Sequence, residues 1–204
     1  MKKINLLLIR HGKTEANEKR LYCGKSNISL SSLGKKEVEE LKEIYRVYEV
    51  ERFFTSGAKR ANETLEILFQ NNIFKELKEF WEYDFGDFEM KSYEMLKENQ
   101  EYIDWILDKK GDVICPNGES KNQYKERIKK AFEKLIDELI KEQIDNAVLV
   151  SHGGTVGILL EIFSKEKGNF YDLQPSCGLG YEVEVLVKNQ EIQFNIKNKF
   201  SKER

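Results

Sequence analysis

Two short hydrophobic runs, each followed by histidine and glycine, constrain the fold of this chain more than any other feature. Residues 6–9 (Leu-Leu-Leu-Ile) precede His11, and residues 147–150 (Ala-Val-Leu-Val) precede His152, with one polar residue between run and histidine in each case. Such a run is typical of a buried parallel strand that ends in a loop. Ligands of open α/β sheets bind beyond the carboxyl ends of these strands. Since the sequence has no other histidine, we expect both imidazoles to meet in one site.

Length and charge exclude several classes of protein. The 204 residues contain no Pro-, Ser- or Gly-rich linker, which predicts one domain over residues 1–204. Lys and Arg total 34 against 36 Asp and Glu, so the net charge of −2 gives no basic field that would favour nucleic acid or an anionic membrane. The first apolar run meets Arg10 too early for a signal peptide or a membrane span. We therefore expect a soluble protein without a nucleic-acid or membrane partner.

The three cysteines argue for a reducing compartment. Cys23, Cys115 and Cys177 are odd in number, widely spaced and free of any Cys-x-x-Cys pair. This pattern favours neither a disulfide framework nor a zinc site and fits the cytoplasm. The acidic residues show no calcium-loop pattern, and a Walker loop is absent. We expect neither a metal ion nor another cofactor.

Hydrophobic periodicity predicts the remaining elements of the fold. We expect helices over residues 31–48, 61–68 and 120–139, strands over 52–55 and before His152, and a closing hairpin of strands 180–187 and 192–196. The region of about 76–118 is rich in aromatic and charged residues, and we interpret it as a lid-like insertion over the site.

The first histidine motif identifies a family. The octapeptide Arg10-His11-Gly12-Lys13-Thr14-Glu15-Ala16-Asn17 resembles the signature of the histidine phosphatase superfamily, also called the phosphoglycerate mutase-like family. A second segment, from Ser56 to Thr64, is similar to the motif of this family in which an arginine, here Arg60, follows serine by four residues. The resemblance spans almost the whole chain. It implies an α/β fold, a three-layer α/β/α sandwich around a mixed, mostly parallel sheet.

The same resemblance implies a mechanism and a phosphate site. His11 would attack phosphorus and form a phosphohistidine. Arg10, Asn17, Arg60 and His152 would contact the phosphate, and backbone amides near Gly153 would add donors. The planar guanidinium of Arg60 suits bidentate binding of a phosphate, which lysine cannot reproduce. Cys23 and Gly24 lie where relatives place substrate-contacting residues, although simple packing explains the Cys23 thiol equally well.

Glu82 is the candidate general acid. By its position before a glycine and an aromatic-glutamate pair, it aligns with the acid of the family. It would protonate the departing alkoxide and later deprotonate the water that cleaves phosphohistidine. Asp84, Asp87 and Glu89 are the competing carboxylates, and Glu89 is the strongest rival.

Three short segments indicate a branch of the family. Residues 21–24, 86–90 and 116–120 look like the alpha-ribazole phosphatase branch of bacterial cobalamin synthesis, in which Glu-Met, here with Met90, replaces the commoner Glu-Gly. Lys13, where glutamate is commoner, is a second departure from the wider family. The resulting expectation is a metal-independent hydrolase of a small-molecule phosphomonoester, either alpha-ribazole 5′-phosphate or the 5′-phosphate of a late cobalamin precursor. The alternatives are a broad-specificity sugar or nucleotide phosphatase and a non-catalytic module that binds phosphorylated ligands. A phosphoglycerate mutase fits less well because the chain is short for that group, and the oligomeric state, monomer or homodimer, stays open.

Overall fold

A computed structural model describes residues 2–71, 73–165, 170–189 and 191–201 of the chain. Six strands form one sheet in the order β3-β2-β4-β1-β5-β6. Parallel pairs join β1 to β4, β4 to β2 and β2 to β3, whereas β5 is antiparallel to both β1 and β6. The strands are β1 (Lys2–Arg10), β2 (Arg52–Thr55), β3 (Lys75–Glu76), β4 (Asn146–Ser151), β5 (Gly180–Lys188) and β6 (Glu191–Lys199). The predicted hairpin of β5 and β6 is thereby confirmed.

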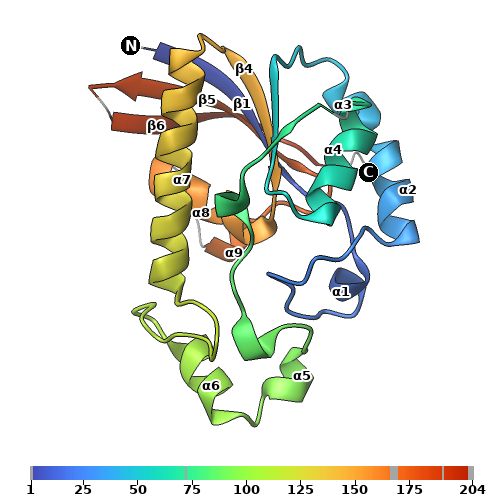
Figure 1. Cartoon of the computed structure of the whole chain (residues 1–204), viewed down its shortest axis with the longest axis vertical. Helices are drawn as coiled ribbons and strands as arrows, with labels where there is room; N and C mark the ends of the chain where they lie inside the picture. The colour runs from blue at the N-terminus through green and yellow to red at the C-terminus, as the bar shows by residue number, and fades with distance from the viewer. Residues whose placement is uncertain (1, 72, 166–169, 190, 202–204) are drawn as a thin grey trace.

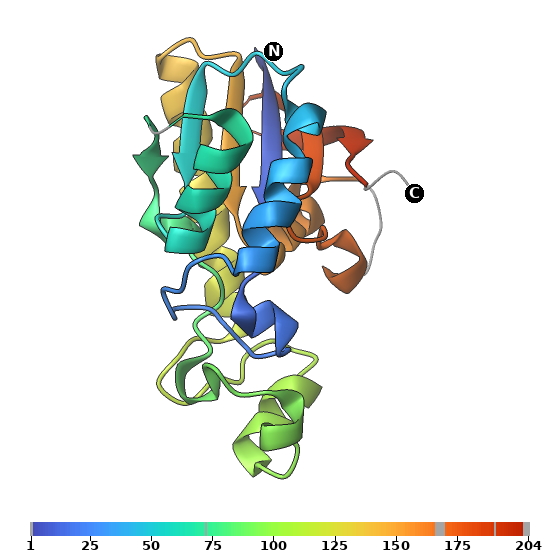
Figure 2. The same ribbon diagram turned by 90° about the vertical axis from the view of Figure 1, so that its right-hand side faces the viewer.

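Both faces of the sheet are covered by helices, which confirms the predicted three-layer α/β/α sandwich (Figures 1 and 2). Leu6 and Leu8 of β1 point to one hydrophobic cluster, and Leu7 and Ile9 point to the other. The continuous apolar run of β1 follows from this burial on both sides. One face packs on α7 (Lys121–Lys141) and α8 (Gly153–Phe163); the other packs on α2 (Ser32–Glu40), α3 (Lys42–Tyr45) and α4 (Lys59–Phe69).

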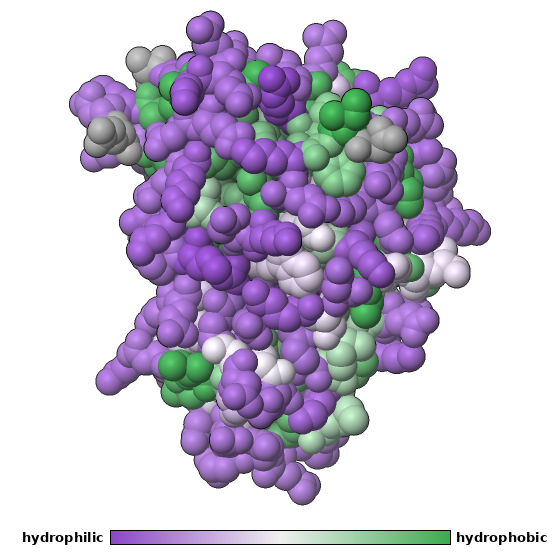
Figure 3. Space-filling model, in the orientation of Figure 1, coloured by the Kyte–Doolittle hydropathy of each residue, from purple (hydrophilic) through white to green (hydrophobic). Residues whose placement is uncertain are grey.

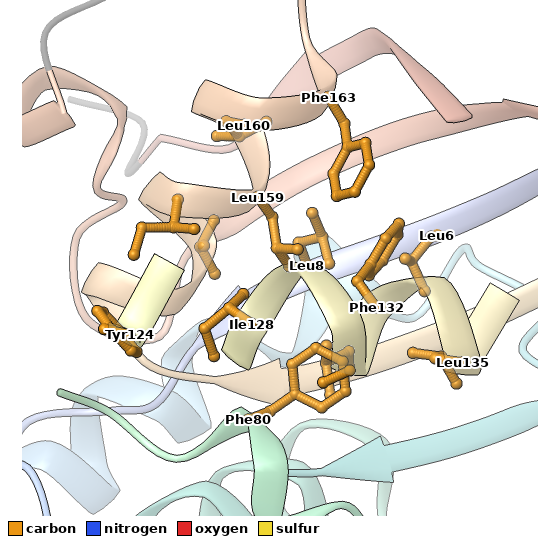
Figure 4. Close-up of a cluster of buried hydrophobic side chains, with 14 of the residues drawn as sticks. Leu6, Leu8, Phe80, Tyr124, Ile128, Phe132, Leu135, Leu159, Leu160 and Phe163 are labelled. Carbon is orange, nitrogen blue, oxygen red and sulfur yellow. The ribbon is translucent and has the colours of Figure 1, made fainter. Parts of the chain in front are cut away.

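Helix α7 forms as its sequence period predicts. Ser120 caps its first turn in a capping box with Gln123, and its buried positions recur every three or four residues along the helix. Phe132, fully buried, packs between the sheet and α8 (Figure 4). Burial of a side chain of this size contributes about 1.5–3 kcal/mol to folding. The core on this face also fixes Tyr124, which lies at the start of α7 and faces the site.

One helix prediction is wrong in its extent. The apolar period of residues 31–48 continues through position 41, but the structure has two helices, α2 and α3, separated at Leu41. The amide of Leu41 donates to Val38 O, three residues back, and thereby tightens the chain into a turn. Regular helix ends at Tyr45 rather than Tyr48.

The segment of residues 76–118 starts in β3 at the edge of the sheet, and its later part, with α5 and α6, lies beyond the carboxyl ends of β1 and β4 (Figure 1). It contains the 3-10 helices η1 (Lys78–Phe80) and η2 (Gly86–Phe88) and the helices α5 (Tyr93–Leu96) and α6 (Gln100–Leu107). Its aromatic residues Phe88, Tyr102 and Trp105 pack on one another and on Tyr22. The interpretation of residues 76–118 as a lid-like insertion of a single domain stays a prediction.

The remaining helices, α1 (Glu15–Glu18) and α9 (Phe170–Leu173), lie at the same end of the sheet. All three cysteines are free thiols. No helix among the described residues is both long and apolar enough to cross a membrane. The face drawn in Figure 3 is mainly hydrophilic, with hydrophobic side chains in small separate groups.

Candidate active site

The two histidines meet, as the sequence predicts. Strands β1 and β4 run side by side in register, with Arg10 opposite Ser151, so the residues after them emerge at the same level. His11 follows β1, and His152 is the N-cap of α8. Their ring centroids lie 5.2 Å apart, edge to face, and both side chains are buried.

Arg60 joins the two imidazoles. Its guanidinium, which is fully buried, donates from Nε to His11 Nε2 at 3.2 Å, and its second terminal nitrogen lies 3.2 Å from His152 Nδ1. An arginine N–H can only donate, so both contacted ring nitrogens carry lone pairs. His11 therefore keeps its proton on Nδ1, 2.7 Å from Gly12 O, and His152 on Nε2, 2.9 Å from the Ser56 hydroxyl.

Both imidazoles are held neutral. Burial lowers the pKa of His11 well below its ordinary value, and the positive charges of Arg60 and Arg10 lower it further. Burial likewise lowers the pKa of His152, with Arg60 the next cause. A neutral imidazole has the free electron pair that attack on phosphorus requires, so the environment of His11 suits a nucleophile.

Arg10, Asn17 and Gly153 are the other predicted phosphate ligands. Arg10 donates to Pro175 O at 3.0 Å, and its buried Nε has no partner among the described residues. Asn17 uses its side-chain oxygen to accept from the amide and hydroxyl of Thr14, which leaves its amide nitrogen for an anion. Gly153 begins α8, an 11-residue helix whose N-terminal amides favour negative charge. A Cβ at Gly153 would lie 3.1 Å from the guanidinium carbon of Arg10.

The loop of residues 23–26 binds Arg60 through its backbone carbonyls. Its carbonyls at Gly24 and Ser26 accept from the guanidinium at 2.9 and 2.8 Å. The Cys23 thiol points to Ser26 O at 3.6 Å, and burial raises its pKa. Gly24 approaches the backbone of Tyr83 so closely that a Cβ there would overlap its carbonyl oxygen. Substrate contact by Cys23 or Gly24 stays a prediction.

Glu82 and its strongest rival have different surroundings. The Glu82 carboxylate accepts from the amide of Gly154 at 2.9 Å, from the amide of Tyr83 at 3.0 Å and from the hydroxyl of Tyr124. Gly154 is only two residues after His152, so Glu82 lies at the N-terminal end of α8. Glu89 instead accepts from the backbone amides of residues 24–26 and from the Ser26 hydroxyl at 2.7 Å. Glu89 therefore braces the loop that binds Arg60.

The two remaining competitors are also engaged in local structure. Asp84 accepts from the amide of Gly86 at 3.1 Å, and Asp87 accepts from the side chain of Asn117 at 3.1 Å. Neither bonds to α8. Of the four carboxylates, Glu82 alone is bonded to the helix that follows His152.

Sequence reasoning missed Tyr124 and Arg127 of α7. Tyr124 donates to Glu82 and lies 2.9 Å from the Thr155 hydroxyl, and burial keeps its pKa well above the ordinary value. Arg127 donates to Glu79 O and Trp81 O at 2.6 and 3.0 Å and pairs with Glu119 at 2.6 Å. Their helical spacing identifies Tyr124 as a core position and Arg127 as a surface charge, so no local signal distinguishes them.

A cavity of about 620 Å³ adjoins Glu82 and Gly154. Its walls come from Tyr22, the 76–118 segment, α7, α8, α9 and Gln174. The volume is large enough for a nucleoside-sized group. Among the described residues, no group of three or more His, Cys, Asp or Glu side chains is placed to hold a metal ion.

Comparison with known proteins agrees with this arrangement. The family model of the histidine phosphatase superfamily (branch 1) matches residues 6–179. The adenosylcobalamin/alpha-ribazole phosphatase of Salmonella typhimurium is 28% identical over 164 residues, 77% of this chain and 78% of that protein. The 2,3-bisphosphoglycerate-dependent phosphoglycerate mutase of Cytophaga hutchinsonii is 28% identical over 187 residues, 87% of this chain and 86% of that protein. The solved alpha-ribazole phosphatase of Shigella flexneri has the same fold, with a TM-score of 0.78 at 21% identity over 95% of both chains.

Proposed function

The chain belongs to the histidine phosphatase superfamily, branch 1, and we propose that it hydrolyses phosphomonoesters through a phosphohistidine on His11. Membership in the family supports a phosphatase or a mutase. The observation that carries the proposal is the bridge from Arg60 to both imidazoles, 3.2 Å on each side, beside the Glu82 carboxylate. It combines a neutral nucleophile, a buried cation and a proton carrier at one end of the sheet.

In the first step, the lone pair of His11 Nε2 forms a bond to phosphorus and the bond to the ester oxygen breaks. The proton of the Glu82 carboxyl passes to the departing alkoxide. Substrate oxygens replace His11 Nε2 as the acceptor of the Arg60 Nε–H, which frees the nucleophile. Arg10, Arg60 and the N-terminal amides of α8 neutralise the charge on the phosphoryl oxygens.

In the second step, Glu82 takes a proton from water, the water oxygen bonds to phosphorus and the P–N bond breaks. His11 returns to its neutral form, and its Nδ1–H remains directed at Gly12 O throughout. The carbonyl of Gly12 thereby stabilises the positive charge that the imidazole acquires in the intermediate. All charge on the phosphate is met by side chains and amides, so EDTA should leave the rate unchanged.

Alpha-ribazole 5′-phosphate is our proposed substrate. The Salmonella relative acts, by its name, on alpha-ribazole and adenosylcobalamin compounds, and this chain carries the residue pattern of that branch around Met90. The aromatic cavity beside Glu82 supports a ring-bearing alcohol as leaving group. A broad-specificity phosphatase is the alternative that the experiment must separate.

A substrate panel tests the proposal. We expect phosphate release from alpha-ribazole 5′-phosphate with a kcat/KM at least tenfold above that for glucose 6-phosphate, and none from His11→Ala protein. Similar values for all esters would favour the broad-specificity alternative. Interconversion of phosphoglycerates in the presence of 2,3-bisphosphoglycerate, without net release, would identify a mutase. Binding without turnover of any ester would identify a non-catalytic module. Acid-labile phosphate on His152 with none on His11 would overturn the choice of nucleophile.

A further inference from the structure

The cavity beside Glu82 has an aromatic wall and a cationic rim. The wall includes Tyr22, Phe85 and Trp105, whose ring centroids lie 5.0 to 6.0 Å from one another. A flat ring can stack on such a wall, with Glu82 at the inner end of the cavity. The rim is formed by lysines from the turn after α6 and from the first turns of α7: Lys109, Lys110, Lys121 and Lys125.

The positive charges of the rim exceed the negative charges. Lys125 pairs with Glu161 at 2.7 Å, and that glutamate lines the same cavity. Among the described residues, Lys109, Lys110 and Lys121 take part in no ion pair within 4.0 Å. The four lysines of the lining face only two lining carboxylates, Glu82 and Glu161, so the lining keeps an excess of positive charge, although the carboxylate of Asp108 also attracts Lys121. In a chain with a net charge of −2, this local excess favours an anion.

Hydrogen bonds fix the backbone that carries the lysines, and they also fix the ammonium group of Lys121. Asp108 accepts from the amides of Lys110 and Val113, both at 2.8 Å, which closes the turn. The carbonyl of Lys110 accepts from Asn122 of α7 at 2.9 Å. Lys121 donates to Asp108 O at 2.9 Å and to Trp105 O at 3.2 Å, so its charge stays at the edge of the aromatic wall. The rim therefore has a defined position relative to Glu82.

We propose that this rim is a second anion subsite, so that an ester with a further phosphate or similar anion on its alcohol, remote from the phosphate that is cleaved, is bound and hydrolysed better than the matching ester without it. The proposal rests on the proposed function, because it treats the cavity as the leaving-group side of the site. A ligand that fills the whole site is then a nucleoside-like alcohol with two anionic groups and a ring that stacks on the aromatic wall. One anion is bound at His11, Arg60 and His152, and the other at Lys109, Lys110 and Lys121.

A pair of nucleotides that differ only in the second anion tests the subsite. Adenosine 5′-monophosphate and adenosine 3′,5′-bisphosphate have the same ribose 5′-oxygen as leaving group, and chromatography of the products shows which phosphate is lost. We expect kcat/KM for release of the 5′-phosphate to be about three- to tenfold higher for the bisphosphate, the size of one or two exposed ion pairs. The ratio should fall toward one at 1 M salt because the lysines are screened.

Two lysine-pair variants separate the rim from general surface charge. In Lys109→Ala/Lys110→Ala protein the ratio should approach one. Lys129→Ala/Lys130→Ala, which removes the same charge from α7 outside the cavity, should leave the ratio as in the wild type. A wild-type ratio of one or less, or an equal effect of both variants, would overturn the subsite while the proposed function stands.

Nucleotide binding to an inactive variant tests the subsite without any need for turnover. In His11→Ala protein, calorimetry should give a dissociation constant three- to tenfold lower for the bisphosphate than for the monophosphate, with the difference lost when Lys109 and Lys110 are also replaced. If wild-type protein releases no phosphate from either nucleotide or from p-nitrophenyl phosphate, the proposed function fails, and this binding ratio still decides whether the subsite exists. Equal dissociation constants would count against the subsite.

Discussion

Arg60 holds the site together through one planar group. Its guanidinium serves His11, His152 and two carbonyls of the 23–26 loop at once, which needs donors in several fixed directions. The family motif predicts a phosphate clamp, but the structure shows that most of its N–H groups already have partners inside the protein. Arg60 is therefore a scaffold for both imidazoles as well as a candidate phosphate ligand.

Arg60→Lys should damage activity and stability together. One ammonium cannot reach both histidines and both carbonyls, so kcat/KM should fall about 10²–10³-fold, as when a preorganised donor is lost. Each buried carbonyl left without a donor should cost about 1–3 kcal/mol in the free energy of unfolding. Phosphatase assays and chemical denaturation measure the two effects, with Lys59→Ala, an exposed neighbour, as the control. Activity close to wild type in the lysine variant would show that the planar geometry is unnecessary.

Glu82→Gln and Glu89→Gln should fail in different ways. Glu82→Gln should slow hydrolysis of a ribose 5′-phosphate about 10²–10⁴-fold but spare the pre-steady-state burst with p-nitrophenyl phosphate, because nitrophenolate leaves with little proton assistance. Glu89→Gln places an NH₂ group among four donors, so it should lower the unfolding free energy by about 1–3 kcal/mol. Glu89→Gln should lower the rates with the ribose 5′-phosphate and with p-nitrophenyl phosphate by the same factor. A leaving-group dependence confined to Glu89→Gln would reverse the assignment.

Arg127 of α7, together with Glu119 just before that helix, fixes the segment that carries Glu82, the proposed acid. Arg127 donates to carbonyls at Glu79, Trp81 and, at 3.3 Å, Glu82, and Glu119 accepts from the amide of Asp84 at 2.9 Å. The pair thus fixes the backbone on both sides of Glu82. The ion pair of Arg127 and Glu119 is only partly buried. We therefore expect it to contribute more by holding the backbone in place than by its electrostatic energy.

Arg127→Gln should therefore act on catalysis through Glu82. We expect kcat for a ribose 5′-phosphate to fall about tenfold with little change in KM, and the burst with p-nitrophenyl phosphate to stay near wild type. Arg46→Gln, which breaks an exposed ion pair on the other face of the sheet, is the matched control. If Arg127→Gln lowers both rates by the same factor, Arg127 supports the fold and does not position the acid.

Local sequence patterns predict those strands and helices whose apolar positions follow a regular period of burial. The apolar run of β1 and the three-to-four spacing of α7 follow directly from packing on both faces of a sheet and on one face of a helix. The break at Leu41 escapes prediction because the apolar spacing continues through it while the backbone tightens. In the site, His11, Arg60 and His152 are predictable since each follows a strand end. Tyr124, Arg127 and the lysine rim are not, because they meet the site only through tertiary packing.

The whole chain contains few groups that change protonation near neutral pH, so its two histidines should dominate the pH dependence of folding stability near that pH. The sequence has only these two, and both are buried and neutral in the folded protein. No other side-chain type has its ordinary pKa between pH 5 and pH 7. The two histidines are therefore the groups expected to make folding stability depend on pH near 6.5.

Folding stability should fall as the pH drops below the ordinary pKa of histidine, about 6.5. The folded state holds both imidazoles below that value, so between pH 6.5 and 5.5 the unfolded chain binds more protons and acidification favours unfolding. Two such groups should lower the free energy of unfolding by about 2 kcal/mol between pH 6.5 and pH 5.5, and they should have no effect on it above pH 7.5.

Urea denaturation at each pH measures the change, and His152→Asn should halve it. Proton NMR of the two imidazoles should show no titration in folded protein down to pH 5.5. A flat stability profile, or an imidazole that titrates near pH 6.5, would mean that the histidines are not held neutral, and the nucleophile proposed for His11 would lose its electrostatic basis.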